Sequence, residues 1–337
     1  MLDHPTLTRR SFLVLTGTAA ALTLVPTRAL GAMTRVRAST ILPWTELSEG
    51  IHAIADLSLG GNTMVVADGP GVLLVDTKFA HLAYALVADA HTLSSGESSL
   101  TLVNTHHHGD HTSGNGFIVP NASKSYAHKN AIPRIEAQLD RMKLGAQGGP
   151  AQVGRMKDAD PRLLELAAKA ADESDALTTN DIAPHSSIGS NETITIGATK
   201  VELHHFGAGH TDNDVVVHLP DRNVLHTGDL VFNTLHPFFD PEGGYSAKGW
   251  IVSLKHTREL CDSDTIVIPG HGPIGDRASI DAQIRYLESI IDEVQRAIDS
   301  GKSKEETQAM SWGFMDGLGF EQIRERAIGA VYDELSK

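Results

Sequence analysis

Short apolar stretches separated by turn-forming residues occur in two parts of the chain. In the first part, β-branched residues cluster in short runs, and Asp68-Gly69-Pro70-Gly71 is a strong turn signal between two of them. These runs predict strands at 50–56, 63–67, 71–76 and 100–103. A second set of runs predicts strands at 193–196, 200–205, 214–219, 223–227 and 265–268. The chain is therefore expected to contain two groups of strands within an α/β fold.

Other segments have helical composition or spacing. Residues 80–93 predict a helix between two of the first strands. Segment 127–179 is rich in Ala, Leu, Lys, Arg and Asp, and we interpret it as a partly helical cap near the mouth of a site. An alternative is that this segment is an insertion that faces solvent. Apolar residues at helical spacing in 281–298 and 320–335 predict outer helices that pack on a sheet.

Composition and charge narrow the possible functions. The 337 residues are 41% hydrophobic and 21% charged, which is the balance of an ordinary globular protein. The formal net charge of -14 argues against a nucleic-acid partner, which requires clustered Lys and Arg. Cys261 is the only cysteine, so no intrachain disulfide can form, and we expect it to be a buried small residue.

The first 32 residues have the pattern of an export signal. Arg9-Arg10 precedes an apolar stretch from Phe12 to Val25, and Ala29-Leu30-Gly31-Ala32 offers small residues for cleavage. This pattern resembles a twin-arginine signal, which implies the twin-arginine translocation machinery as a partner. The apolar stretch is shorter than the ~20 residues of a membrane span and is diluted by Thr and Gly. We therefore expect no stable membrane anchor, although an uncleaved anchor remains an alternative.

This signal defines the expected organisation of the chain. Residues 1–32 form the signal, 33–49 a lead-in, and 50–337 the functional domain, which includes the cap. The protein is expected to be periplasmic or secreted, and to cross the membrane already folded. The C-terminal helices give no support for dimerisation, so the oligomeric state stays undetermined.

The most specific chemical pattern in the chain is the segment H-x-H-x-D-H. It places His106, His108, Asp110 and His111 within six residues. Imidazole and carboxylate are suitable zinc ligands, and four of them so close together exceed the needs of a structural cross-link. A metal site is therefore the leading hypothesis for this segment.

Three further candidate ligands lie downstream at the ends of apolar runs or beside them. They are His210, Asp229 and His271, and each has Gly, Pro, Thr or Asn as a neighbour. This is the pattern of strands that end in functional loops. A rigid sheet can bring such loop residues together at one edge.

With these motifs the chain resembles the metallo-β-lactamase superfamily of zinc hydrolases from about residue 51 to the C-terminus. The resemblance implies a four-layer αβ/βα sandwich, in which two mixed sheets pack face to face with helices outside. It also implies two zinc ions per chain, the first held by His106, His108 and His210. The second ion would be held by Asp110, His111 and His271. Asp229 would bridge the two ions.

Two adjacent zinc ions imply a specific chemistry. A water held between them loses a proton near neutral pH, because both cations stabilise hydroxide. Asp110 is the expected catalytic residue, since its carboxylate would orient this hydroxide. We therefore expect an exported dinuclear zinc hydrolase that cleaves an ester, lactone, thioester or lactam carbonyl of a small molecule.

The residue at position 229 bears on the branch of the superfamily. The segments 209–211 and 267–272 resemble the true zinc β-lactamases, but those with this loop pattern carry Cys where this chain has Asp229. A bridging carboxylate is typical of thioesterases, lactonases and related esterases of the family, and the first motif also resembles hydroxyacylglutathione hydrolase. The alternatives left open are a β-lactamase proper, a metal-dependent phosphodiesterase or sulfatase, and a non-catalytic zinc-binding periplasmic protein.

Candidate substrate contacts follow Asp229 along the chain. His236 lies in a loop just beyond it, and aromatic residues among Gly and Pro suggest an apolar pocket wall. The candidates are His236, Phe238, Phe239, Tyr245 and Trp250. His107 is the middle residue of H-x-H, so in an extended segment it should point away from the metal of its neighbours.

Replacing both signal arginines tests the export route. Arg9→Lys combined with Arg10→Lys should leave the precursor in the cytoplasm, because the twin-arginine pattern depends on this pair. Cell fractionation and immunoblotting measure the outcome. Unchanged export of the double variant would instead identify an ordinary secretory signal.

Overall fold

The computed structural model describes residues 40–94 and 98–337. The expected export signal, 1–32, and residues 33–39 of the expected lead-in lie outside the described residues. Within the described part of the chain, no helix is both long and apolar enough to cross a membrane.

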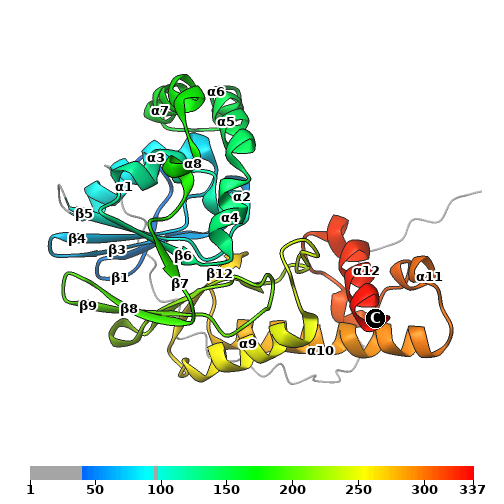
Figure 1. Cartoon of the computed structure of the whole chain (residues 1–337). Helices are drawn as coiled ribbons and strands as arrows, with labels where there is room; N and C mark the ends of the chain where they lie inside the picture. Colours follow the sequence, from blue (N-terminus) through cyan, green and yellow to red (C-terminus); the bar gives the residue numbers. More distant parts are fainter. Residues whose placement is uncertain (1–39, 95–97) are drawn as a thin grey trace, which may run out of the picture. The chain divides into compact units, whose positions relative to one another are not determined.

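Two mixed β-sheets form the centre of the fold (Figure 1). The seven strands of the first sheet lie side by side in chain order: β1 (Thr45–Ser48), β2 (Ile51–Ile54), β3 (Thr63–Asp68), β4 (Gly71–Val75), β5 (Ser99–Val103), β6 (Lys124–His128) and β7 (Ser186–Ile188). The second sheet has the order β12-β11-β10-β9-β8, with β8 (Asn191–Ile196), β9 (Thr199–His204), β10 (Val216–Leu219), β11 (Val224–Phe232) and β12 (Ile266–His271). Strands β4 to β7 are parallel, as are β11 and β12, and the other neighbours are antiparallel.

Alternating side chains on the strands create separate apolar layers. Met64 and Val66 of β3 belong to the core between the two sheets, whereas Val65 belongs to the core under the helices of the first sheet. This alternation follows from the two-residue period of a strand. Burial of apolar residues on both faces explains why most strands read as continuous hydrophobic runs.

Helices cover the outer face of each sheet (Figure 1). On the first sheet they are α1 (Ala83–Leu93), α2 (Gly109–Thr112), α3 (Asn115–Ile118), α4 (Ala131–Glu136), α5 (Leu139–Gln147), α6 (Gly149–Val153), α7 (Pro161–Glu173) and α8 (Thr179–Ile182). On the second sheet α9 (Ala247–Glu259) and α10 (Arg277–Asp299) pack together, and they are followed by α11 (Lys304–Gln308) and α12 (Arg324–Leu335). The expected four-layer αβ/βα sandwich is thereby confirmed.

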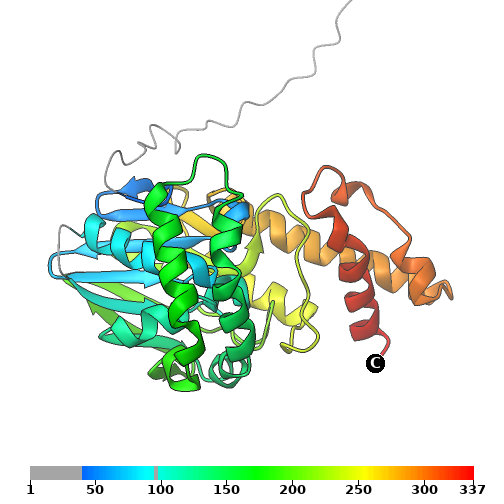
Figure 2. The ribbon, with the colours of Figure 1, turned by 90° about the horizontal axis from the view of Figure 1, so that it is seen from above.

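The segment expected to form a cap is largely helical. Helix α7 begins where Asp160 accepts a hydrogen bond from the Arg162 backbone and Pro161 occupies the first turn. Leu163, Ala167 and Ala170 then form one buried face at helical spacing. Figure 2 looks onto this helical layer, with α5 and α7 in front of the first sheet.

The structure corrects several expected boundaries. Strand β11 continues to Phe232, so Asp229 lies inside a strand and not in a loop, whereas His271 is the last residue of β12. Strand β1 lies within 33–49, which was expected to precede the domain. Strands β6 and β7 were not predicted, because they are short and polar and depend on pairing within the sheet. The last predicted helix packs against α10 and α11 and not on a sheet.

Candidate metal centre and active site

The candidate ligands of the first motif lie directly beyond strand β5. The chain leaves β5 at Val103 and bends through His106 and His108, which precede the short helix α2. Helix α2 carries Asp110 and His111. The parallel neighbours β4 and β6 hold β5 in the middle of the sheet, so this motif starts from a rigid support.

Two parallel strands position Asp229 and His271. The register between β11 and β12 shifts at Gly228, whose φ of 52° is readily adopted only by glycine. Next to it, a side chain at Gly270 would place its Cβ 1.9 Å from Asp229 Oδ1. Gly228 permits this backbone conformation, and Gly270 has no side chain that would occupy the space. The Asp229 carboxylate can therefore lie between β11 and β12.

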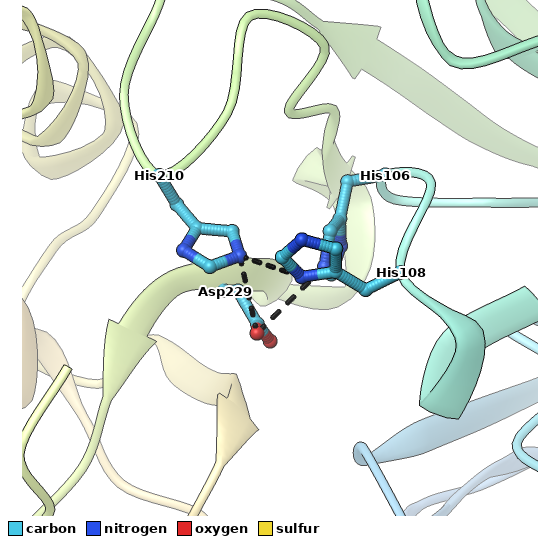
Figure 3. Close-up of side chains that lie close together, drawn as sticks. All are labelled: His106, His108, His210 and Asp229. Carbon is cyan, nitrogen blue, oxygen red and sulfur yellow. Dashed lines mark hydrogen bonds and ion pairs between the residues drawn. The ribbon is translucent and has the colours of Figure 1, made fainter. Parts of the chain in front are cut away.

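A first group of ligand atoms surrounds one side of Asp229 (Figure 3). His210 Nε2 lies 3.1 Å from His108 Nδ1 and 3.5 Å from Asp229 Oδ2. His106 Nε2 lies 3.7 Å from the same carboxylate oxygen. His106, His108, His210 and Asp229 thus form one compact group that can hold a metal ion.

A second group lies on the other side of Asp229. His271 Nε2 is 3.1 Å from Asp110 Oδ2 and 3.4 Å from His111 Nε2. Asp229 also reaches this group, with Oδ1 3.1 Å from His111 Nε2 and Oδ2 3.4 Å from His271 Nε2. The structure therefore brings all seven sequence-predicted ligands together, with Asp229 between the two groups.

These spacings suit zinc. Neighbouring ligand atoms of a tetrahedral zinc ion lie about 3.3 Å apart, because each bond is about 2.0–2.1 Å long. His106 Nε2 is buried and has no hydrogen-bond partner, an arrangement that is costly unless the nitrogen binds something else. The donor set of imidazoles and carboxylates, and this orphaned nitrogen, both fit a metal centre.

The charges of the two groups also fit bound cations. Burial alone would raise the pKa of Asp229, but His271, His111 and His106 outweigh it and hold that pKa well below its usual value. Burial opposes protonation of His271, yet the carboxylates of Asp229 and Asp110 raise its pKa to about 9. The buried carboxylates thus require positive charge nearby, which either imidazolium groups or metal ions can supply.

Outer partners hold the imidazole rings in place. His210 Nδ1 lies 2.8 Å from the carbonyl oxygen of Phe238, and His111 Nδ1 lies 2.8 Å from Asp76 Oδ2. His108 Nε2 lies 2.8 Å from Asp240 Oδ2. In each ring, one nitrogen belongs to a ligand group and the other contacts one of these outer partners. Such contacts orient metal-binding histidines.

Sequence reasoning missed Asp76 and Asp240. Asp76 directly follows the apolar strand β4, so it carries the same strand-end signal as the predicted ligands. Asp240 follows an irregular aromatic loop and reaches His108 only through the tertiary fold, so no local pattern indicates it.

His107 belongs to neither of these two ligand groups, although it lines the cavity next to them. Its Nδ1 lies 3.2 Å from Asn213 Oδ1, and its Nε2 lies 3.5 Å from Asp240 Oδ2. His107, His108 and Asp240 also lie close enough together to hold a metal ion, but His108 would then have to bind that ion through Nε2. We favour the group with His210, because it uses His108 Nδ1 and leaves Nε2 to Asp240.

Four of the candidate ligands line a cavity of about 740 Å³, namely His108, Asp110, Asp229 and His271. This volume lies in the range of small-molecule sites. Phe232, Phe238 and Phe320 form an apolar part of its wall. Helices α4 and α5 contribute Arg134 and Arg141, so this part of the expected cap does border the site.

Only Phe238 of the expected substrate contacts lines this cavity. His236 does not, because its ring is buried between the Tyr286 hydroxyl, 3.0 Å from Nδ1, and Glu321, 3.1 Å from Nε2. The expectation for His236 is therefore corrected: helix α10 and the segment before α12 enclose it.

The other three aromatic residues are also turned away from the cavity. Trp250 belongs to helix α9, and its indole nitrogen donates to the carbonyl oxygen of Leu230. Phe239 is buried against Trp250, and the Tyr245 hydroxyl donates to the carbonyl oxygen of Ala330 in α12. Phe239, Tyr245 and Trp250 thus pack the loop against the C-terminal helices, which the local sequence could not reveal.

Comparison with known proteins supports the fold and the motif together. Residues 58–271 match the model of the metallo-β-lactamase superfamily. The chain belongs to the metallo-β-lactamase superfamily. This match includes all seven candidate ligands, whereas Phe320 and the rest of the C-terminal segment lie beyond it.

Individual relatives of the superfamily are distant. A metallo-β-lactamase type 2 from Bacillus sp. (strain 170) is 31% identical over 93 residues, which are 27% of this chain and 36% of that enzyme. The chain thus matches about a third of the length of the Bacillus enzymes. The metallo-β-lactamase type 2 of Bacteroides fragilis is 21% identical over 272 residues, which cover 77% of this chain and 93% of that enzyme.

Solved structures of the superfamily share the fold. DIM-1 metallo-β-lactamase gives a TM-score of 0.51 at 22% identity, covering 73% of this chain and 96% of that one. The inverting sec-alkylsulfatase Pisa1 from Pseudomonas sp. gives a TM-score of 0.60 at 17% identity, covering 86% of this chain and 49% of that one. At these identities the similarity establishes the fold alone.

Asp240 can be tested as a positioning residue of the metal centre. Asp240→Asn should weaken metal affinity by about 10–100-fold, because the carboxylate that holds the ring of His108 is lost. His107→Ala is the matched comparison, since His107 also faces Asp240 but lies outside the favoured ligand groups. Competition titration with a zinc-binding dye measures both. An effect of His107→Ala as large as that of Asp240→Asn would contradict the ligand assignment.

Proposed function

We propose that this member of the superfamily is an exported dinuclear zinc hydrolase that cleaves an ester, lactone, thioester or lactam carbonyl of a small molecule. The observation that carries the proposal is the position of Asp229 in the cavity lining. Its Oδ2 lies 3.5 Å from His210 Nε2, and its Oδ1 lies 3.1 Å from His111 Nε2. Ligands on both sides of one carboxylate favour two ions over one.

Two zinc ions in these groups would supply an acidic water molecule and an electrophile for a substrate oxygen. Asp110 is the residue best placed to handle the proton of that water. Its side chain is 30% exposed toward the cavity, and the neighbouring imidazoles keep its pKa below the usual value against the effect of burial. An ionised Asp110 accepts a hydrogen bond from the attacking water and orients it.

The cavity wall suggests how a substrate is held. Phe232, Phe238 and Phe320 provide an apolar surface that excludes water from one side of the substrate. Arg134, which also lines the cavity, is already paired with Asp212, whereas Arg141 is exposed. Arg141 is therefore suited to a negatively charged substituent, such as a carboxylate next to the scissile bond.

The positive charge of Arg141 favours a second candidate function, that of a metal-dependent sulfatase. A sulfate ester brings its own negative charge to the wall that carries Arg141. A β-lactamase and a non-catalytic zinc-binding protein remain alternatives. The non-catalytic alternative gives no reason for a cavity that leaves Asp110 accessible.

Export is a separate part of the proposal. It is supported by Arg9-Arg10, the apolar stretch that follows and the small residues at 29–32. The twin-arginine machinery would deliver the folded protein to the periplasm or the medium.

Metal content and substrate range test the proposal directly. Protein purified without chelator should contain about two zinc ions per chain, because seven ligands of suitable type converge. A panel containing an ester, a lactone, a thioester, a β-lactam, an alkyl sulfate and a phosphodiester should reveal turnover that a chelator abolishes and zinc restores. Elemental analysis that finds one tightly held iron ion and no zinc would refute the metal assignment. Zinc binding without turnover of any member would favour the non-catalytic alternative.

Asp110→Asn tests the proton-handling role. We expect kcat on the best panel substrate to fall by about 100-fold or more with a smaller change in KM, because the amide keeps the shape and loses the charge. Asp140→Asn on the exposed side of α5 is the matched control and should behave like the parent. Zinc content must be measured in both variants. An Asp110→Asn enzyme with full zinc and unchanged kcat would exclude this role.

A further inference from the structure

Three potential metal ligands lie on the second sheet, outside the catalytic cavity. They are Glu202 and His204 of β9 and His218 of β10, which we call the β9–β10 cluster. Their strand neighbours Val201, Leu203, Val217 and Leu219 all face the core between the sheets. Because side chains alternate, the three polar residues point to the opposite, outer face of the sheet.

The sheet register brings the cluster together. Glu202 and His218 are directly opposite each other on antiparallel strands, and His204 follows Glu202 by two residues on the same face. Glu202 Oε2 lies 3.2 Å from His204 Nε2 and 3.2 Å from His218 Nδ1. All three ligand atoms lie within 4.8 Å of one another. These positions follow from paired strands and not from a mobile loop.

The distances and donor types suit zinc. Neighbouring ligand atoms of a tetrahedral zinc ion lie about 3.3 Å apart, close to the spacing of each imidazole nitrogen from Glu202 Oε2. Lys200 binds the other oxygen, Oε1, which leaves Oε2 directed at the two rings. His204 also stacks on Phe206, with ring centroids 5.4 Å apart and an interplanar angle of 8°. Both the carboxylate and one ring are thus held in position.

The protonation states of the cluster do not oppose a metal ion. Burial lowers the pKa of His218, and the contact with Lys200 lowers the pKa of Glu202 to about 2 against the effect of desolvation. A neutral imidazole and an ionised carboxylate are the ligand forms that zinc requires. The side chains of Glu202, His204 and His218 are 21%, 14% and 9% exposed, so an ion can enter from solvent.

We propose that Glu202, His204 and His218 form an additional zinc site that cross-links β9 and β10, with water completing the coordination. The site is independent of the proposed hydrolase chemistry, because none of its three ligands lines the catalytic cavity. Zinc bound there stabilises the folded state, since binding favours the conformation in which the two strands are paired.

Equilibrium dialysis of the full-length protein against buffered zinc tests the site. His204→Ala combined with His218→Ala should bind one zinc ion fewer per chain than the parent, and panel turnover per chain should stay unchanged. His256→Ala is the matched control, because His256 is an exposed imidazole on α9 that stacks on Phe206 from the cluster's side of the sheet. It should bind as much zinc as the parent.

Lys200→Gln separates a metal site from a simple ion-pair cluster. Removing the cation that competes for Glu202 should preserve or strengthen the additional zinc binding. Thermal unfolding followed with and without zinc should show a zinc-dependent rise in Tm that the double histidine variant has partly lost. If Lys200→Gln abolished the additional binding, Glu202, His204 and His218 would not be sufficient to hold the ion, and the proposed three-ligand site would be wrong.

Anomalous diffraction from zinc-soaked crystals of the parent gives a test that needs no variant. A zinc peak within bonding distance of Glu202, His204 and His218 is expected. Absence of that peak, or equal zinc binding by the parent and the double variant, would overturn the proposal. Loss of catalytic turnover with the peak still present would concern only the cavity metals, so the two proposals fail separately.

Discussion

The burial of the Asp229 carboxylate is the constraint on which the site depends. Its side chain is only 3% exposed, and a buried charge is tolerated only when opposite charge surrounds it. Four imidazoles, those of His106, His111, His210 and His271, therefore converge on it from separate segments of the chain. This convergence requires the close parallel approach of β11 and β12, which Gly270 permits.

Part of the cavity wall comes from outside the segment that carries the candidate ligands. These ligands lie within the segment matched by the superfamily model, whereas the wall residues Phe320, Gln322 and Ile323 lie beyond it. Phe320 packs edge-on against His271 at 5.8 Å, and Arg326 lies 4.5 Å from the ring of Phe238. The C-terminal segment thus shapes the space beside the candidate metal centre.

Strands β9 and β10 connect the two sites physically. The loop between them carries His210, and their outer face carries Glu202, His204 and His218. Asp214 in this loop accepts hydrogen bonds from the backbone and hydroxyl of Thr211, and burial raises the pKa of Asp214 to about 8. These contacts within the loop, together with the contact of His210 Nδ1 with the carbonyl oxygen of Phe238, hold His210 without the outer cluster.

The sequence by itself determined the candidate ligand set and most of the strands, because both follow from local patterns. His106, His108, Asp110 and His111 are close neighbours in the chain, and His210, Asp229 and His271 follow or end apolar runs. Only the tertiary structure decided the surroundings of these ligands. Asp240 meets His108 across 132 positions, and His236 is enclosed by Tyr286 and Glu321. The physical reason is that hydrophobic periodicity reports which face of a strand or helix is buried, whereas a polar contact between distant loops depends on how those elements pack.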